Sequence, residues 1–211
     1  MTGILIAFVI ALLVPLFVSK WRTSLLGLAL QGALLAAIAY RQHGFSISTT
    51  TAVTIVDLVV VRAVVMPGWL FVTLRRQNAP LRNDVIAPNL FSWAMALALV
   101  VVAFRTADVL VPAEGNEQSL VAVSTSAFLL GLFVLATARG MVSQVIGLLR
   151  VENAIALFEL GTPSEHTSLA IRIGQTALML VSVGFCRWYL MGLRESLGPV
   201  AAAPSEETAE L

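Results

Sequence analysis

Long apolar runs separated by short polar links dominate the sequence. A helix needs about 20 predominantly apolar residues to cross the hydrocarbon core of a bilayer, and runs close to this length recur along the chain. They are nearly uncharged and lack the alternation of a membrane β-strand, so they predict helices. We therefore expect an all-α integral membrane protein, a bundle of about seven transmembrane helices. The predicted spans are Ile4–Ser19, Thr23–Tyr40, Thr49–Thr73, Pro88–Val111, Ser119–Ala138, Gln144–Leu160 and Thr167–Tyr189.

Composition points to the same class of protein. Hydrophobic residues make up 58% of the chain and charged residues 12%, whereas a soluble domain is about one quarter charged. So few charges cannot cover a fold of this size in water, which makes lipid the expected outer solvent. The net charge of +1 offers no basic patch for nucleic acid. Cys186 is the only cysteine and the two histidines fall in separate predicted links, so no metal motif and no cofactor are expected.

The spans divide the chain into parts. Residues 1–111 form a predicted four-helix part, residues 112–118 a link on the extracytoplasmic side, and residues 119–194 a three-helix part. Residues 195–211 are rich in glutamate and proline and predict a disordered acidic tail. The N-terminus enters apolar sequence without a preceding basic region, which favours an uncleaved first span over a signal peptide.

The positions of lysine and arginine predict the orientation in the membrane. Cytoplasmic links carry an excess of these residues. Alternate links hold eight of them, whereas the opposite links hold only Arg41. The N-terminus is therefore expected outside and the C-terminus in the cytoplasm, which also requires an odd number of spans. The eight residues are Lys20, Arg22, Arg75, Arg76, Arg82, Arg139, Arg187 and Arg194.

Charged side chains also occur inside or near the ends of the predicted spans. A charge at the bilayer centre costs roughly 3 kcal/mol on insertion scales, so these residues are expected to face the bundle interior, a water-filled cavity or a partner subunit. They are Arg62, Arg105, Arg150 and Arg172 together with Asp57, Asp108, Glu152 and Glu159.

Their spacing suggests a relay of charges. Arg62 and Glu152 fall near the middle of two spans, and Glu159 shares a helix face with Glu152, about 10 Å further along. Arg105 and Asp108 are three residues apart and form a candidate outer charge pair. Three interpretations stay open, namely a proton relay or gate, buried ion pairs that lock helices together, and docking of a partner.

Two further features concern helix geometry. Pro67 lies inside a predicted span, where it removes a backbone hydrogen bond and is expected to kink the helix. A run of small residues in the second span favours close helix packing. That run comprises Gly27, Ala29, Gly32, Ala33, Ala36 and Ala37.

Two stretches resemble known membrane subunits. Gln144–Leu160 reads Q-V-I-G-L-L-R-V-E-N-A-I-A-L-F-E-L. It resembles the second helix of the NuoK-type subunit of respiratory complex I and of MrpC-type antiporter subunits, in which an acid and an Asn follow I-G-L within two turns. Arg62, five positions before Pro67, resembles a basic residue of hydrogenase-4 component E, which joins an N-terminal helix group to a NuoK-like group.

The resemblance implies specific residue roles. Glu152 and Asn153 would be the relay acid and its polar neighbour, and Arg62 the basic residue of the third span. The sequence departs from the NuoK pattern at two places. Leu149 stands where that helix carries its acid, and Arg172 stands where the third helix of the family carries one. Because an arginine keeps its proton, Arg172 cannot replace an acid in a proton path.

A non-catalytic membrane subunit of a hydrogenase or complex I-like oxidoreductase is the function that the resemblance implies. Its expected place is the bacterial or archaeal cytoplasmic (inner) membrane, in contact with lipid, antiporter-like membrane-arm subunits and soluble iron–sulfur redox subunits. It would connect the redox chemistry of these partners to proton or cation translocation and couple the two processes. It would hold no cofactor of its own. Relay candidates are Asp57, Arg62, Arg150, Glu152, Asn153, Glu159 and Arg172. The alternative function is that of a stand-alone secondary transporter.

Overall fold

The computed structural model describes residues 1–13, 18, 20–43, 49–76, 90–111, 115–138, 140–161 and 169–197. Nearly all of this part of the chain is helical and none of it forms a strand, which confirms the all-α prediction for it. The elements are α1 (Thr2–Leu13), α2 (Trp21–His43), α3 (Thr49–Val56), η2 (Asp57–Val65), α4 (Met66–Arg76), α5 (Leu90–Leu110), α6 (Asn116–Thr137), α7 (Met141–Gly161) and α8 (Leu169–Leu197).

α3, η2 and α4 follow one another without a break and form one continuous helical rod, so the described residues make seven rods, one for each predicted span. Four rods are long and apolar enough to cross a membrane. α1 has 12 residues, which make about 18 Å of helix. The predicted span continues to Ser19, and residues 14–17 and 19 lie outside the described part. The four long apolar rods are Trp21–Gln42, Thr51–Arg76, Leu90–Leu110 and Asn116–Thr137.

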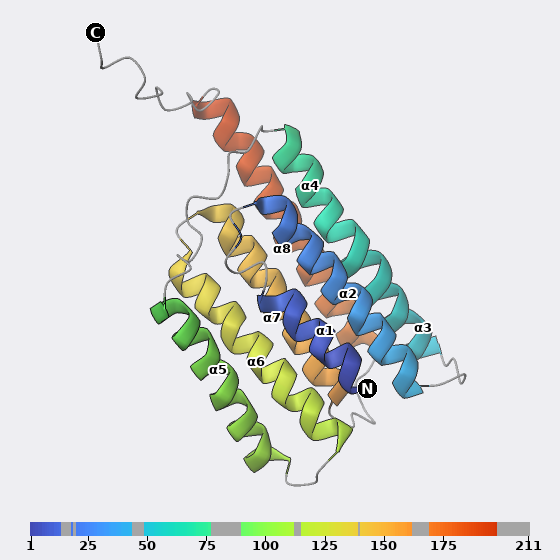
Figure 1. Cartoon of the computed structure of the whole chain (residues 1–211). Helices are drawn as coiled ribbons and strands as arrows, with labels where there is room; N and C mark the ends of the chain where they lie inside the picture. Colours follow the sequence, from blue (N-terminus) through green and yellow to red (C-terminus); the bar gives the residue numbers. More distant parts are fainter. Residues whose placement is uncertain are drawn as a thin grey trace.

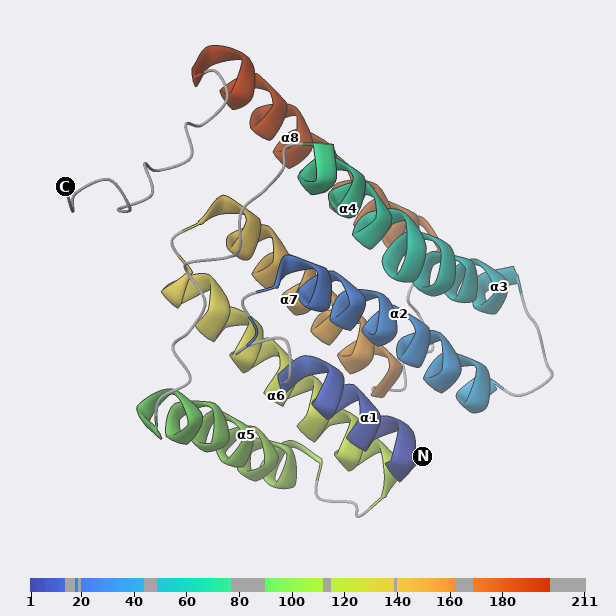
Figure 2. The ribbon, with the colours of Figure 1, turned by 45° about the horizontal axis from the view of Figure 1, so that its top comes forward.

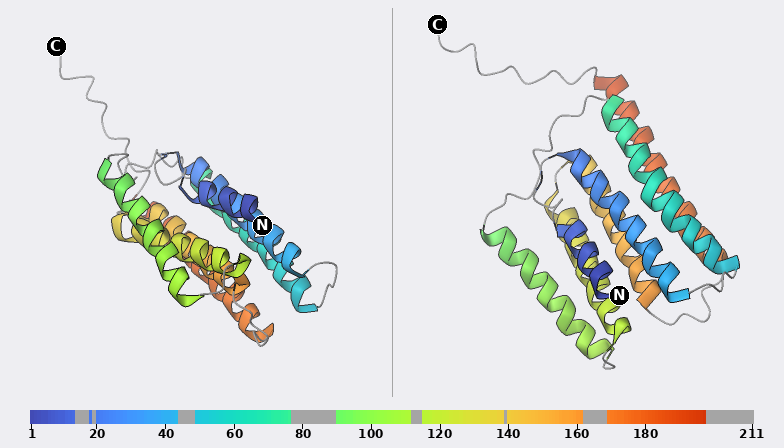
Figure 3. Two further views of the ribbon diagram at one scale, coloured as in Figure 1. Left: turned by 60° about the horizontal axis from the view of Figure 1, so that its bottom comes forward. Right: turned by 45° about the vertical axis from the view of Figure 1, so that its right-hand side comes forward.

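The rods pack side by side with their axes roughly aligned (Figure 1). α5 forms one edge and packs on α6, whereas α4 and α8 form the opposite edge (Figure 2). α1, α2, α6 and α7 lie between these edges, with α1 against α2 and α6. α8 contacts mainly α4 and α7, and a second direction of view shows α8 alongside α4 at the rim of the bundle (Figure 3).

Glycines bring several helix backbones into close contact. A Cβ added to Gly32 of α2 would lie 2.7 Å from the backbone nitrogen of Ala63 in η2, so only glycine fits this contact. α6 and α7 meet in a similar way, because a Cβ on Gly131 would lie 2.7 Å from Cγ2 of Val151. The prediction that small residues of the second span permit close packing is confirmed at Gly32.

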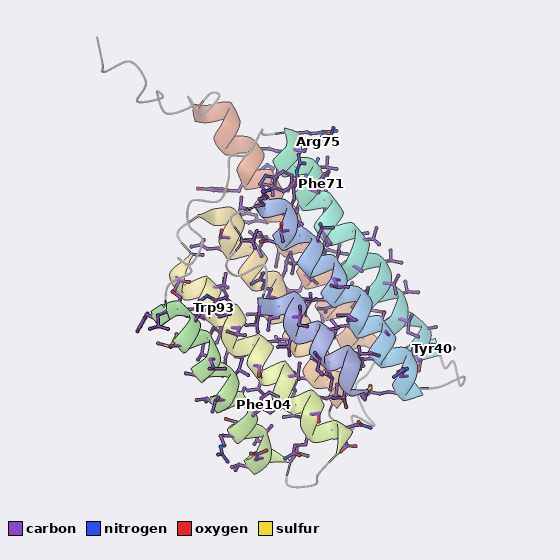
Figure 4. All side chains as sticks on the ribbon, viewed as in Figure 1. Tyr40, Phe71, Arg75, Trp93 and Phe104 are labelled. Atoms are coloured by element: carbon purple, nitrogen blue, oxygen red, sulfur yellow. The ribbon has the colours of Figure 1, made fainter. Side chains whose placement is uncertain are left out.

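The bundle has two distinct ends. At the Arg76 end, α4 and α8 finish and α2 and α7 begin; at the Gly161 end, α2 and α7 finish and α3 and α8 begin. Arg75 and Phe71 lie at the Arg76 end and Tyr40 at the other (Figure 4). The helix ends that flank the 112–118 link lie opposite the C-terminal end of α8 (Figure 1).

The end of α8 corrects one predicted boundary. The acidic tail was expected to begin at residue 195, but α8 continues to Leu197, because Glu195 and Ser196 do not interrupt a helix that is already formed. Residues 198–211 lie outside the described part.

Candidate functional site

A π-helix interrupts the third rod. Asp57–Val65 adopts this wider form, and the backbone N–H of Met66 donates to the carbonyl of Val61, five residues back. The segment ends at Val65, two residues before Pro67, which lacks an N–H and clashes with the carbonyl four residues back in a regular α-helix. The sequence predicts a kink at Pro67; the structure has a π-helix just before it, a form found mostly as short insertions within α-helices and often at functional sites.

The π-helix brings together two charges that a regular α-helix would separate. Residues five apart in an α-helix point about 140° away from each other, whereas the π-helical hydrogen bond joins residues five apart. Asp57 and Arg62 are five apart, and Arg62 Nε donates to Asp57 Oδ2 over 3.0 Å. Their side chains are only 17% and 6% exposed. Asp57 and Arg62 therefore form an ion pair that is largely shielded from the surroundings.

A chain of hydrogen bonds extends from this ion pair to four other helices. Thr176 Oγ1 of α8 donates to Asp57 Oδ1 over 2.8 Å. On the other side, Arg62 Nη1 donates to the backbone carbonyl of Glu152 over 2.9 Å and to Asn153 Oδ1 of α7 over 3.4 Å. We call Thr176, Asp57, Arg62, Asn153 and Gln31 the buried polar network.

Two amides complete this network. Asn153 Nδ2 donates to Gln31 Oε1 of α2 over 3.4 Å, and Gln31 Nε2 donates to the carbonyl of Ala11 in α1 over 3.3 Å. These contacts are longer than the most common hydrogen-bond distance. Gln31 and Asn153 are buried, so the contacts still meet the needs of amides that water cannot reach.

A small cavity lies beside the ion pair, between the third rod, α7 and α8. It encloses about 30 Å³ and is lined by the polar side chains of Thr54, Asp57, Arg62, Glu159, Gln175 and Thr176 and by four apolar side chains. A buried water needs about 10–15 Å³ of such space, so this Asp57 cavity has room for about two waters. Glu159 Oε1 accepts a hydrogen bond of 2.7 Å from Gln175 Nε2, which holds its carboxylate at the cavity wall.

Glu152, a relay candidate from the sequence, contacts the ion pair through its backbone. It does lie at the depth of Arg62, because Arg62 bonds to its backbone carbonyl over 2.9 Å. Its half-buried carboxylate, however, takes part in no hydrogen bond or ion pair with any described residue. The carboxylate next to Arg62 is that of Asp57, since the π-helix turns Asp57 toward the arginine.

The remaining relay candidates are placed as follows. Asn153 belongs to the buried polar network. Arg150 precedes it by one turn on the same face of α7 and is 2% exposed, so its predicted position inside the bundle is confirmed. The side chain of Arg172 lies outside the described residues, although its backbone belongs to α8.

The predicted outer charge pair does not form. Arg105 and Asp108 are both exposed near the end of α5, and no ion pair joins them in the described structure. Asp108 Oδ1 instead accepts a hydrogen bond of 3.0 Å from Gln118 Nε2 of α6. Both side chains therefore lie on the surface of the chain and not in its interior, so that of the three expected surroundings the bundle interior does not apply to them.

Four polar residues of the site were not among the sequence candidates. Gln31, Thr54, Gln175 and Thr176 are uncharged, whereas nearly all of the candidates were charged residues. A usable signal was present, because each is a hydrogen-bonding side chain within a long apolar stretch, where an unsatisfied polar group is costly. Gln31 also stands next to Gly32, at the contact that brings α2 against η2.

The site contains no convergent set of metal ligands in the described part of the chain, where no three His, Cys, Asp or Glu side chains come together. The arrangement is a buried ion pair, extended by amides on one side and by a cavity with a second carboxylate on the other. No protein-family model, curated protein or solved structure matches this chain.

Proposed function

We propose that the chain is a membrane subunit of a multisubunit oxidoreductase complex similar to hydrogenase-4 or complex I. In this proposal it contributes no catalytic centre and couples redox chemistry in its partners to the movement of protons. The observation that carries the proposal is the Asp57–Arg62 ion pair, which is buried among apolar helices and linked by hydrogen bonds to four other helices.

Physical reasoning favours a role beyond stability for this ion pair. Charges removed from water carry a desolvation penalty, and replacement of a buried ion pair by apolar side chains is often neutral or stabilising. In membrane helices such residues are rare and mark ion pathways and proton relays. A pair in a π-helix, beside a cavity with room for water, fits a relay better than a simple helix clamp.

The network assigns different tasks to its members. Asp57 and Glu159 border the Asp57 cavity, and carboxylates can bind and release protons through water. Arg62 keeps its proton and therefore stays positively charged. Its attraction to the neighbouring carboxylates changes when they bind or release a proton. The amides of Asn153 and Gln31 carry the hydrogen-bond chain across to α2 and α1.

The size of the cavity narrows the choice of solute. Pockets for organic ligands usually measure about 300–1,000 Å³, whereas the Asp57 cavity encloses about 30 Å³. Water and a small cation fit this space and an organic solute does not. This argues against a transporter of organic solutes built on this site. The hydrogenase-4 or complex I context rests on the resemblance of Gln144–Leu160 and of Arg62 with Pro67.

Proton pumping by the assembled complex tests the coupling role. We would replace Glu159 by Gln, which keeps the size and the hydrogen-bond acceptor but removes the charge, and use Asp108→Asn as the control at an exposed carboxylate. In inverted membrane vesicles, Glu159→Gln should leave complex yield and redox turnover near normal while protons pumped per turnover fall. Asp108→Asn should change none of the three. Unchanged pumping in Glu159→Gln would remove Glu159 from the path.

Co-purification from native membranes tests the assembly. The proposal expects hydrophobic partner subunits together with iron–sulfur proteins. If the chain purified only as a homo-oligomer that transports a cation in liposomes, a stand-alone secondary transporter would replace the proposed complex subunit.

A further inference from the structure

An apolar groove lies along the third rod and α8, away from the Asp57 cavity. It has a volume of about 660 Å³ and is lined by Val64, Val65, Gly68, Trp69, Val72 and Leu180. The side chains of Val64 and Val72 are 63% and 42% exposed, so the groove faces the surroundings of the bundle. α4 and α8 lie side by side at the edge of the molecule where it occurs (Figure 2).

Basic residues stand at one end of this groove. The guanidinium of Arg187 lies over the ring of Trp69, with its carbon 5.4 Å from the ring centroid. From the end of η2 along α4, Val65, Trp69, Val72 and Arg76 follow at steps of three or four residues and therefore share one face. Arg76 follows Val72 by about 6 Å, directly beyond the apolar lining. The groove thus has an apolar body and a cationic end.

We infer that the groove binds an anionic phospholipid, with an acyl chain between Val64 and Val72 and the phosphate at Arg187 and Arg76. The inference rests on the placement of α4 and α8 in a membrane, which is part of the proposed function, and not on the coupling role.

Charge complementarity favours a lipid with a negative headgroup. In the described part of the chain, the basic residues beside the groove, Arg187 and Arg76, stand toward the end that is predicted to face the cytoplasm. Each basic residue near an anionic membrane surface contributes about 1 kcal/mol of attraction, which corresponds to about fivefold in affinity. Trp69 joins the two regions, because tryptophan suits the boundary between acyl chains and headgroups. An apolar helix from a partner would meet the apolar side chains of the groove but would bring no anion to Arg187.

The glycine at position 68 allows the groove to be filled without disturbing the fold. A Cβ added to Gly68 meets no atom within 4 Å, so Gly68→Leu occupies the space for the acyl chain. Gly174 is equally open and lies six residues before Leu180, on a different face of α8. Gly174→Leu is therefore the matched control. Arg105→Gln is the control for loss of an exposed arginine remote from the groove.

The test measures lipid binding to the purified full chain in detergent by native mass spectrometry. Phosphatidylglycerol and phosphatidylcholine with identical acyl chains are the two probes. We expect phosphatidylglycerol to bind more tightly, Arg187→Gln to weaken it about fivefold, and Gly68→Leu to abolish the retained lipid. Gly174→Leu and Arg105→Gln should bind as the natural chain does.

Three results would overturn the inference. Equal binding of the two lipids would exclude a headgroup site, and full retention of lipid by Gly68→Leu would exclude the groove as the acyl-chain site. In the assembled complex, a cross-link from Val72→Cys to a neighbouring subunit, with no lipid retained, would show that a protein covers the groove. None of these measurements depends on proton pumping. A negative lipid result therefore leaves the coupling proposal intact, and a negative pumping result leaves the lipid site testable.

Discussion

The Asp57–Arg62 ion pair gives a quantitative prediction through a double-mutant cycle. Removal of one partner of a buried ion pair typically costs about 3–5 kcal/mol, because the other charge stays buried without compensation. For Asp57→Asn we expect the lower end, about 3 kcal/mol, since Arg62 still donates to the carbonyl of Glu152 and to Asn153. Arg62→Gln should cost a similar amount, because it strands the Asp57 carboxylate.

The double mutant separates charge pairing from loss of contacts. Asp57→Asn with Arg62→Gln leaves two neutral amides that can bond to each other, so its loss of stability should be clearly smaller than the sum of the single losses. We expect a coupling energy of about 2–3 kcal/mol, within the range for residues in direct contact. Under the proposed coupling role, the same neutral pair lacks the Asp57 carboxylate, so the complex should assemble and fail to pump protons.

Reversible unfolding of the purified chain in mixed micelles measures this cycle. Asp108→Asn with Arg105→Gln is the matched control, because these charges are exposed and not paired with each other; its coupling energy should be close to zero. Additive effects of Asp57→Asn and Arg62→Gln, with a coupling energy below about 0.5 kcal/mol, would refute the ion pair as an interacting unit.

Three further predictions concern other parts of the molecule. Glu152→Gln should leave the stability and yield of the complex unchanged, because the buried polar network uses only the backbone carbonyl of this residue; a large loss of yield would place its carboxylate in a contact with a partner. Gly32→Ala should destabilise the chain by about 1–3 kcal/mol in the same unfolding assay, because the new Cβ would lie 2.7 Å from the nitrogen of Ala63. Reporter fusions after Asn116 and after Leu211 should give opposite signals, and matching signals would contradict the predicted topology.

Hydrophobic pattern alone was enough to predict the helices of this chain. The third predicted span, Thr49–Thr73, corresponds to the rod from Thr49 to Arg76, because a run of about 20 apolar residues leaves little choice of secondary structure in lipid. The close contact at Gly32 could also be predicted, since small residues in membrane helices mark helix interfaces.

The partners of the charged residues could not be predicted in the same way. Spacing arguments assumed an α-helix, which turns Asp57 away from Arg62, whereas the π-helix turns it toward Arg62. Pro67 signalled an irregular turn, but not which carbonyls would change partner. Thr176 is 119 residues from Asp57 along the chain, and nothing in the local sequence of α8 specifies that contact.

The close packing of α6 and α7 has a consequence for motion within the bundle. Val151 of α7 lies directly against Gly131 of α6, and a Cβ at Gly161 would lie 2.9 Å from Leu120 Cβ, so these two helices interlock and we expect them to move together. α8 meets the rest of the bundle mainly along α4 and α7. A sliding shift of α8 along its axis would therefore meet the least resistance. Because Gln175 and Thr176 belong to α8, such a shift would break the bond of Gln175 to Glu159 and that of Thr176 to Asp57 together, while Arg62 would remain bonded to Asp57.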